Sequence, residues 1–487
     1  MDRYFDRRHL AISITALFAA GASGAADQDS SIPNMTPFAN HAGFAATYST
    51  AGKVDLTGPF FQSLGTNGRA CVTCHQPSVG WTITPANVQQ RFALTGGTDP
   101  VFRTNDGSTS PLADVSTVEA RRAAYSMLLN KGLIRVGIGI PADAEFELVA
   151  VDDPYGYASA SELSLFRRPQ PSTNLNFLST VMWDGRETFK DATSKDCIRG
   201  TTNCFASVHF DLSDQANGAT TGHAQGRPLS DAQREAIVAF ESSLFTAQIF
   251  DFEAGNLTAQ RAHGGPEYLS QQPFYFGMND VVAGDYKTGA KFNPAVFKLY
   301  DAWNSNGRVR TNDDGNDAHG IHFDRDRDNA RRSVARGEIL FNTRPIQIKD
   351  VKGLNDDLNI PVLQGTCTTC HDTPAAGNHS IPAPLDIGLA DASRRTPDMP
   401  LYTLRHKQPP FETIETTDPG RALVTGKWKD IGRFKGPVLR ALATRAPYFH
   451  NGSAKDLGAV VDFYNERFNL GLTDDEADDL VAFLLTL

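Results

Sequence analysis

Apolar residues recur at helical spacing near the middle and at the end of the chain. In "LSDAQREAIVAFESSLF" (229–245), Ile237, Phe240 and Leu244 follow one another at intervals of three or four residues. This interval places them on one face of a helix. The segment "LTDDEADDLVAFLLTL" (472–487) has the same kind of pattern. We therefore predict an amphipathic helix in each segment, with its apolar face packed in a core.

Each of these helices is preceded by a polar start signal. Ser230 stands three residues before Gln233, and Thr473 stands three residues before Glu476. In such a capping box the hydroxyl and the longer side chain each bind the other residue's backbone N–H group. The spacing predicts that the helices begin directly after Ser230 and Thr473.

The first 26 residues combine a charged start with a short apolar stretch. "MDRYFDRRH" is followed by "LAISITALFAAGA", and small residues such as Ser23 and Ala25 come next. The apolar stretch is too short to cross a bilayer as a stable helix, and the order of features is that of an export signal. We predict that residues 1–26 are a signal peptide and that the mature chain has no integral membrane segment. A membrane anchor is the alternative, and a bacterial periplasm is the expected location.

Length and charge narrow the classes of function. The chain has 487 residues, of which 40% are hydrophobic and 21% charged, and its formal net charge is -10. The length is sufficient for two or three domains. Because a protein that binds nucleic acid needs a basic face, the acidic balance argues against a nucleic-acid partner.

Four of the six cysteines lie in two copies of Cys-x-x-Cys-His, "CVTCH" (71–75) and "CTTCH" (367–371). In an exported chain this motif is typical of covalent haem attachment. Two thiols bind the porphyrin's vinyl groups, and the next imidazole reaches the iron. We predict two c-type haems, held by the residues listed here: Cys71, Cys74, His75, Cys367, Cys370 and His371.

Two other chemistries use paired cysteines. A split four-cysteine zinc site leaves the histidine after each pair unexplained, and a thioredoxin-type redox pair leaves the second copy unexplained. The remaining cysteines, Cys197 and Cys204, form either a local disulfide or two free thiols.

The repeat extends beyond the motifs. "GPFFQSLGTNGRACVTCH" leads into the first motif, and "RGEILFNTRP" precedes the second. Each copy therefore has a phenylalanine-bearing segment, a haem motif and a closing amphipathic helix. We predict an all-α fold with two cytochrome c-like haem domains in tandem, at 27–245 and 331–487. Residues 246–330 have no counterpart and are predicted to be a linking segment.

Two further segments resemble the bacterial dihaem cytochrome c peroxidase and MauG family. They are "STNLNFLSTVMWDGRETF" (172–189) and the stretch with "APYFHNG" (432–468). The resemblance extends over nearly all of the mature chain. It implies an all-helical periplasmic enzyme that reduces hydrogen peroxide to water. Electrons from a small cytochrome c or cupredoxin would pass from the C-terminal haem to the N-terminal haem.

The resemblance also implies ligands for the two irons. His75 and His371 are the proximal ligands. No histidine follows the first motif until His209, so we expect the first iron to have an open position without reductive activation. Tyr464 matches the position of the family's distal ligand at the second iron, and Met399 is the alternative.

Other functional positions are carried over residue by residue. Trp183 matches the family tryptophan between the haems. Gln215 matches the glutamine that precedes the family's catalytic glutamate, but Gln225 stands where that glutamate is expected. An amide cannot transfer protons, so we assign the acid–base role to His223, which can do so near neutral pH.

A calcium ion is a further possibility implied by the resemblance, near Arg168, Arg445 and Pro447.

Two other functions stay open beside the peroxidase. One is a MauG-like enzyme that uses peroxide to oxidise a partner protein, and the other is a dihaem electron carrier without catalysis.

Overall fold

The computed structural model describes residues 30–189, 196–197, 204–304 and 320–487. The predicted signal peptide lies outside these residues. Within them, no helix combines the length and the apolar character that a bilayer crossing requires.

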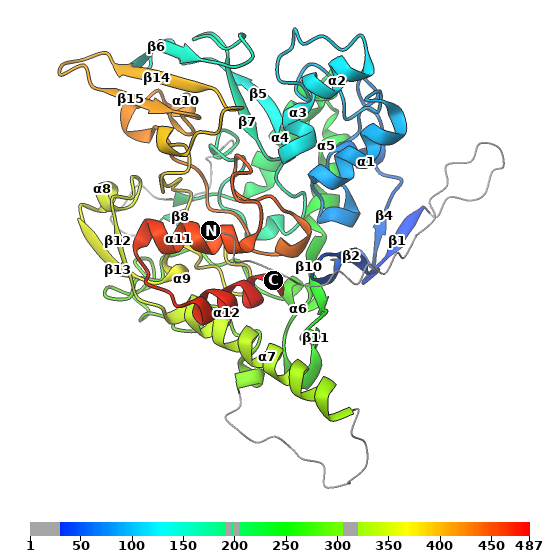
Figure 1. Ribbon diagram of the computed structural model, residues 1–487, viewed down its shortest axis with the longest axis vertical. Helices are drawn as coiled ribbons and strands as arrows, with labels where there is room; N and C mark the ends of the chain where they lie inside the picture. Colours follow the sequence, from blue (N-terminus) through cyan, green and yellow to red (C-terminus); the bar gives the residue numbers. More distant parts are fainter. Residues whose placement is uncertain (1–29, 190–195, 198–203, 305–319) are drawn as a thin grey trace, which may run out of the picture. The chain divides into compact units, whose positions relative to one another are not determined.

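The fold mixes helices with small antiparallel sheets (Figure 1). The helices are α1 (Pro85–Thr95), α2 (Val118–Ala124), α3 (Ser126–Lys131), α4 (Val208–Gly222), α5 (Asp231–Ser242), α6 (Pro266–Ser270), α7 (Gly320–Thr343), α8 (Asn355–Leu358), α9 (Cys367–Cys370), α10 (Ala422–Thr425), α11 (Leu457–Phe468) and α12 (Asp474–Leu485). The strands are β1 (Ser31–Pro33), β2 (Phe38–Asn40), β3 (Gly43–Ser49), β4 (Lys53–Asp55), β5 (Ile134–Ile138), β6 (Phe146–Asp152), β7 (Leu163–Arg167), β8 (Asp196–Cys197), β9 (Cys204–Phe205), β10 (Leu244–Asp251), β11 (Gly255–Asn256), β12 (Ile346–Lys349), β13 (Val362–Gly365), β14 (Leu401–His406) and β15 (Thr413–Thr416).

The prediction of an all-α fold is therefore wrong. Of the described residues, 33% are helical and 19% lie in strands or bridges. The largest sheet has the strand order β11-β10-β3-β2, and a second has the order β15-β14-β6. In β14 the buried side chains of Tyr402 and Leu404 alternate with more exposed neighbours. This alternation is typical of a strand, but the alternating segment is too short for the sequence alone to identify it.

Both predicted amphipathic helices are confirmed, with their capping boxes. The Ser230 hydroxyl accepts from the Gln233 backbone N–H group at the start of α5, and Thr473 does the same for Glu476 at the start of α12. The expected helix over 229–245 is shorter than predicted, because Leu244 begins strand β10.

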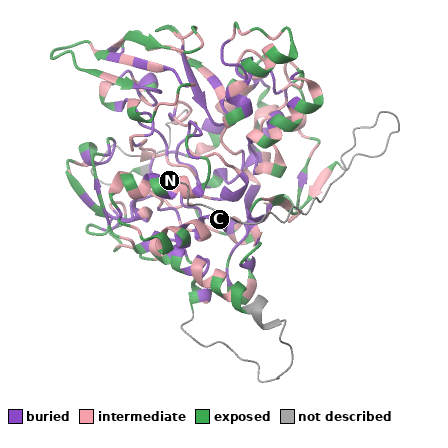
Figure 2. Ribbon diagram, in the orientation of Figure 1, coloured by how far each residue is buried: buried purple, intermediate pink, exposed green. Residues whose placement is uncertain are grey.

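Residues 31–487 form one compact unit. Its largest apolar cluster joins α4, α5, α7, α11 and α12, and Figure 2 shows exposed residues on the outer faces of helices such as α2. Sheet pairing also joins distant parts of the sequence, since β6 pairs with β14. Helix α7 begins at Gly320, inside the segment predicted to link two domains. The domain boundaries 27–245, 246–330 and 331–487 stay a prediction.

Candidate functional site

Both Cys-x-x-Cys-His motifs open onto one cavity with a volume of about 430 Å³. Each motif forms a single helical turn, in which the histidine N–H group donates to the first cysteine's carbonyl oxygen over 3.0 Å. The two turns are capped in the same way. Thr73 Oγ1 accepts from the N–H group of Ala70, and Thr369 Oγ1 accepts from that of Thr366, each over 3.0 Å. The sequence repeat is thus also a structural repeat.

The repeated phenylalanine segments have equivalent places too. The ring centroid of Phe60 lies 6.3 Å from that of His75, and the centroid of Phe341 lies 6.0 Å from that of His371. Phe60 belongs to a short 3₁₀ turn, whereas Phe341 belongs to α7. Each histidine is therefore packed against an aromatic ring from the segment that precedes its motif.

The two motif histidines are hydrogen-bonded through the same ring nitrogen, Nδ1. His75 Nδ1 lies 3.0 Å from the carbonyl oxygen of Trp81 and 3.0 Å from Ser172 Oγ, and His371 Nδ1 lies 2.6 Å from the carbonyl oxygen of Gly377. A carbonyl oxygen only accepts, so Nδ1 carries the proton and Nε2 has a free lone pair. This arrangement orients imidazoles that bind metals.

The electrostatic environment keeps these imidazoles neutral. Burial lowers the pKa of His75 to about 4, and burial also lowers the pKa of His371. A neutral imidazole is the form that binds iron.

The four motif cysteines are free thiols beside the cavity. Burial raises the pKa of Cys71, Cys367 and Cys370 to about 12, and it also raises the pKa of Cys74. A reactive redox pair requires a thiolate, the form that this environment disfavours.

The described residues contain no group of three or more histidines, cysteines and carboxylates arranged to hold a metal ion. Two pairs of partly buried thiols, each with an imidazole whose Nε2 is free, fit two covalently attached haems.

His223, the predicted acid–base residue, forms a network with two residues that sequence reasoning missed. Its Nδ1 lies 2.5 Å from Asp106 Oδ2, and Arg69 Nη1 lies 2.5 Å from Asp106 Oδ1. Burial alone would raise the pKa of Asp106, but the charges of Arg69 and His223 outweigh it and lower this pKa. All three residues line the cavity with His75.

The other two residues predicted to be catalytic also line the cavity. Gln215 lies on α4, and Trp183 donates from Nε1 to the carbonyl oxygen of Arg168 over 2.8 Å. Gln225, the expected neighbour of His223, is not among the residues that line the cavity.

The two candidates for the second distal ligand lie in different places. Tyr464, on α11, lines the cavity, and burial and the neighbouring Cys370 and Cys367 raise its pKa. Met399 packs in a separate cluster with Phe166 and is absent from the cavity wall. The structure therefore brings Tyr464, and not Met399, together with the second motif.

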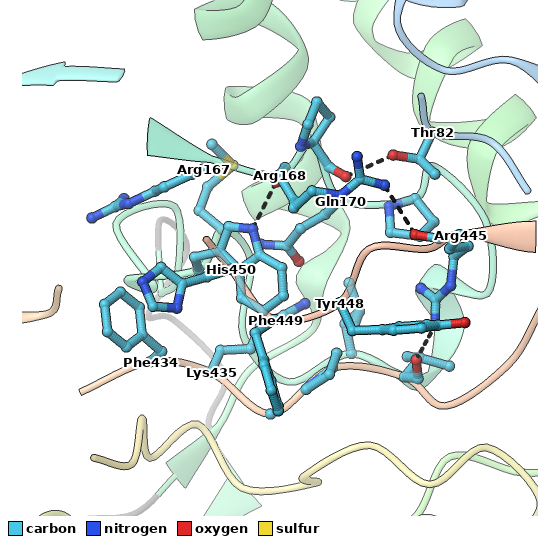
Figure 3. A pocket seen from close by; sticks show the side chains of 18 of the residues that line it. Thr82, Arg167, Arg168, Gln170, Phe434, Lys435, Arg445, Tyr448, Phe449 and His450 are labelled. Atoms are coloured by element: carbon cyan, nitrogen blue, oxygen red, sulfur yellow. Dashed lines mark hydrogen bonds between the residues drawn. The ribbon is translucent and has the colours of Figure 1, made fainter. Parts of the chain in front are cut away.

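The residues expected near calcium do not fit a cation. Arg168 Nη2 donates to the carbonyl oxygen of Arg445 over 3.0 Å (Figure 3). Two guanidinium groups thus lie where a calcium ion would need anionic or neutral oxygen ligands.

Cys197 and Cys204 form a disulfide between β8 and β9. The sequence left this pairing open.

Comparison with known proteins gives partial matches. No family model matches the chain. The chain is 30% identical over 194 residues to cytochrome c peroxidase IdrP1 of Pseudomonas sp. (strain SCT), which covers 35% of this chain and 45% of that protein. It is 32% identical over 149 residues to the cytochrome c551 peroxidase of Nitrosomonas europaea, covering 28% and 37%. It is 41% identical over 78 residues to Ccp of Escherichia coli, covering 16% and 17%.

A solved structure, of a MauG-like protein associated with microbial copper homeostasis, matches with a TM-score of 0.33 and 16% identity. That match covers 88% of this chain and 85% of the other. The sequence matches to the curated relatives span less than half of those proteins. On these sequence matches, the chain is a distant homologue of the bacterial dihaem cytochrome c peroxidases.

Proposed function

We propose that this protein is a periplasmic dihaem c-type peroxidase that reduces hydrogen peroxide to two molecules of water, consuming two electrons and two protons. The observation that carries the proposal is the Asp106–His223 pair, a buried carboxylate bonded to a partly exposed imidazole, in the same cavity wall as His75. A c-type haem, when bound, supplies an iron that can bind an oxidant and exchange electrons.

The chain's own residues supply the proton chemistry. The Asp106 carboxylate accepts a hydrogen bond from His223 Nδ1, which leaves Nε2 to exchange protons with a bound oxygen. His223 can take a proton from one oxygen of hydrogen peroxide and return it to the other oxygen, which leaves as water. Asp106 stabilises the imidazolium that forms between these two steps, and Arg69 keeps Asp106 ionised.

Positioning residues support the two haem sites. Trp81 and Ser172 orient His75, and the carbonyl oxygen of Gly377 orients His371. Trp183 lies in the shared wall and is our candidate for an electron relay. Electrons would come from a small cytochrome c or cupredoxin and enter at the C-terminal site, as the resemblance implies.

A second candidate function is MauG-like oxidation of a partner protein with peroxide. The observation that favours it is Tyr464 in the cavity wall beside Cys367 and Cys370. A dihaem carrier is the third possibility, and it would bind neither peroxide nor cyanide.

The test compares His223→Ala with the wild type after both are shown to carry two haems per chain. Loss of a general acid–base residue should slow the peroxide step by about 10²- to 10⁴-fold. His209→Ala is the matched control, because His209 is half exposed and pairs with Glu235. An unchanged peroxide step in His223→Ala would remove the assigned role, and a wild type without peroxide reduction would remove the proposed function.

A further inference from the structure

Three cationic side chains gather at one part of the cavity wall (Figure 3). Arg168 and Lys435 are buried, with 5% and 8% of their surface exposed, and Arg445 is partly buried. Among the residues that the structure describes, no carboxylate forms an ion pair with any of the three. Buried charges in proteins are normally paired, so this region lacks a negative partner.

The positive charges of Arg168, Lys435 and Arg445 repel one another. Burial, together with the charge of Arg445, lowers the pKa of Lys435 to about 7. Burial and Arg445 likewise lower the pKa of Arg168 to about 9. An anion in this part of the cavity would relieve both the burial cost and the repulsion.

Arg168 is already hydrogen-bonded, whereas Lys435 is not. The Arg168 guanidinium donates to four carbonyl oxygens, those of Ile83, Lys131, Gly132 and Arg445. Within the described parts of the chain, no acceptor bonds the Lys435 ammonium group. Lys435 is held in place by its backbone instead, because its N–H group donates to the carbonyl oxygen of Trp183 over 2.8 Å.

Two neighbouring side chains also have polar atoms without partners. Arg445 Nε and both ring nitrogens of His450 are buried, and no described group is within hydrogen-bonding reach of them. The His450 ring is fixed by stacking on Phe434, with centroids 3.9 Å apart. Leaving a buried donor unbonded costs about 1–3 kcal/mol. Several unbonded donors in one wall therefore indicate a ligand rich in acceptor oxygens.

We propose that Lys435, Arg445 and His450 form an anion site that receives carboxylate groups of the porphyrins. Each haem carries two carboxylates, which need positive or hydrogen-bonding partners once they are buried. The site would turn those carboxylates toward the wall that holds Trp183 and so set the orientation of the cofactor. This inference rests on the proposed binding of two haems.

The test measures the haem midpoint potentials of Lys435→Gln in the mature protein. Removing a positive charge beside a porphyrin carboxylate disfavours the reduced iron, because reduction adds negative charge to the same site. We expect at least a tenfold shift in the one-electron reduction equilibrium of one haem, a fall of 59 mV. Lys435→Arg should keep a potential near the wild-type value.

Lys455→Gln is the matched control, since it removes the same charge from a side chain that is 87% exposed, and it should shift neither potential. Haem content is determined first, so that loss of the proposed function is recognised separately. Two haems with unchanged potentials in Lys435→Gln would overturn the inference. So would a crystal structure of the mature protein with chloride or phosphate on Lys435 and the carboxylates elsewhere.

Discussion

If the second motif holds a haem as proposed, Tyr464 in the cavity wall is the candidate for its distal ligand. Tyr464 stands beside Cys367 and Cys370, whereas Met399 is buried in another cluster. We expect Tyr464→Phe to convert the second haem from a low-spin to a high-spin ferric spectrum, because the phenyl ring has no oxygen to bind iron. Electron paramagnetic resonance of the ferric protein measures this change.

Met399→Leu is the control for that experiment. It keeps most of the apolar volume of that cluster and removes the sulfur of the alternative ligand, which lies outside the cavity wall, so the spectrum should stay unchanged. A low-spin signal that survives in Tyr464→Phe and disappears in Met399→Leu would reverse the assignment.

At the scale of residues, the sequence identifies what is close along the chain. The motif residues Cys71, Cys74 and His75 are recognisable because their spacing is the one that covalent haem attachment requires. Asp106 is not, because it meets His223 from 117 positions away and nothing in its own neighbourhood marks it. Lys435 is hidden for the same reason, since only the folded chain shows that its ammonium group has no bonded acceptor among the described residues.

At the scale of elements, the packing of α7 on α12 depends on one glycine. A Cβ atom on Gly337 would lie 1.9 Å from the carbonyl oxygen of Asp479 and 2.7 Å from the Cβ of Phe483. Backbone cannot yield as a flexible side chain can, so Gly337→Ala must push the helices apart. We expect a loss of about 2–3 kcal/mol in the free energy of unfolding, by analogy with overpacked cores, measured by chemical denaturation.

Gly218→Ala is the matched control within a helix. Gly218 lies on α4, and a Cβ atom there would have no neighbour within 4 Å. Alanine is a better helix former, so this variant should gain about 0.5–1 kcal/mol. Equal effects of the two substitutions would contradict the close approach of α7 and α12.

Helix α7 also anchors the segment before it through a buried carboxyl group. Glu338 accepts from the backbone N–H groups of Leu299 and Tyr300, over 2.5 and 2.9 Å. Burial raises the pKa of Glu338 from 4.5 to about 7, although these two hydrogen bonds oppose the rise. Below pH 4.5 the group is protonated in both the folded and the unfolded chain, and its contribution to stability is then complete.

Between pH 4.5 and 7 the unfolded chain loses this proton before the folded chain does, so stability falls as the pH rises. The total loss is about 3 kcal/mol, from 1.36 kcal/mol per pKa unit. In Glu338→Gln this pH dependence should be absent. The variant protein should be less stable than the wild type overall, because the amide group cannot accept both hydrogen bonds. Unfolding curves across this pH range measure the difference, and parallel curves for both proteins would refute it.

The sequence predicted helices with clear ends and missed the sheets between them. The capping boxes of α5 and α12 are local signals, and both are present as expected. Strands β6 and β14 are short, and their pairing joins residues about 250 positions apart in the chain, such as Glu147 and Arg405. Pairing over such distances depends on the fold as a whole, and this is why the expected all-α fold was wrong.

At the scale of the whole molecule, a buried ion network joins two distant parts of the chain. Arg167 and Asp184 precede α5, and Asp418 follows the second Cys-x-x-Cys-His motif. Arg167 Nε and Nη2 donate to the two carboxylate oxygens of Asp418 over 2.7 and 2.8 Å, and Nη1 donates to Asp184 over 2.6 Å. All three side chains are nearly inaccessible to solvent, with at most 3% exposed. An uncompensated charge in such a place is far more costly than on the surface.

Asp418→Asn should therefore destabilise the protein by about 3–5 kcal/mol, the usual cost of leaving one member of a buried pair uncompensated. Glu147→Gln is the matched control, because the Glu147–Arg405 pair joins the same two regions but its side chains are 43% and 47% exposed. Exposed pairs contribute only about 0–1 kcal/mol, so this variant should unfold almost as the wild type does. Denaturation followed through both the protein and the haem absorbance would compare them. If the two substitutions lower the free energy of unfolding equally, burial does not make the Arg167 network a stronger connection than the exposed Glu147–Arg405 pair between β6 and β14.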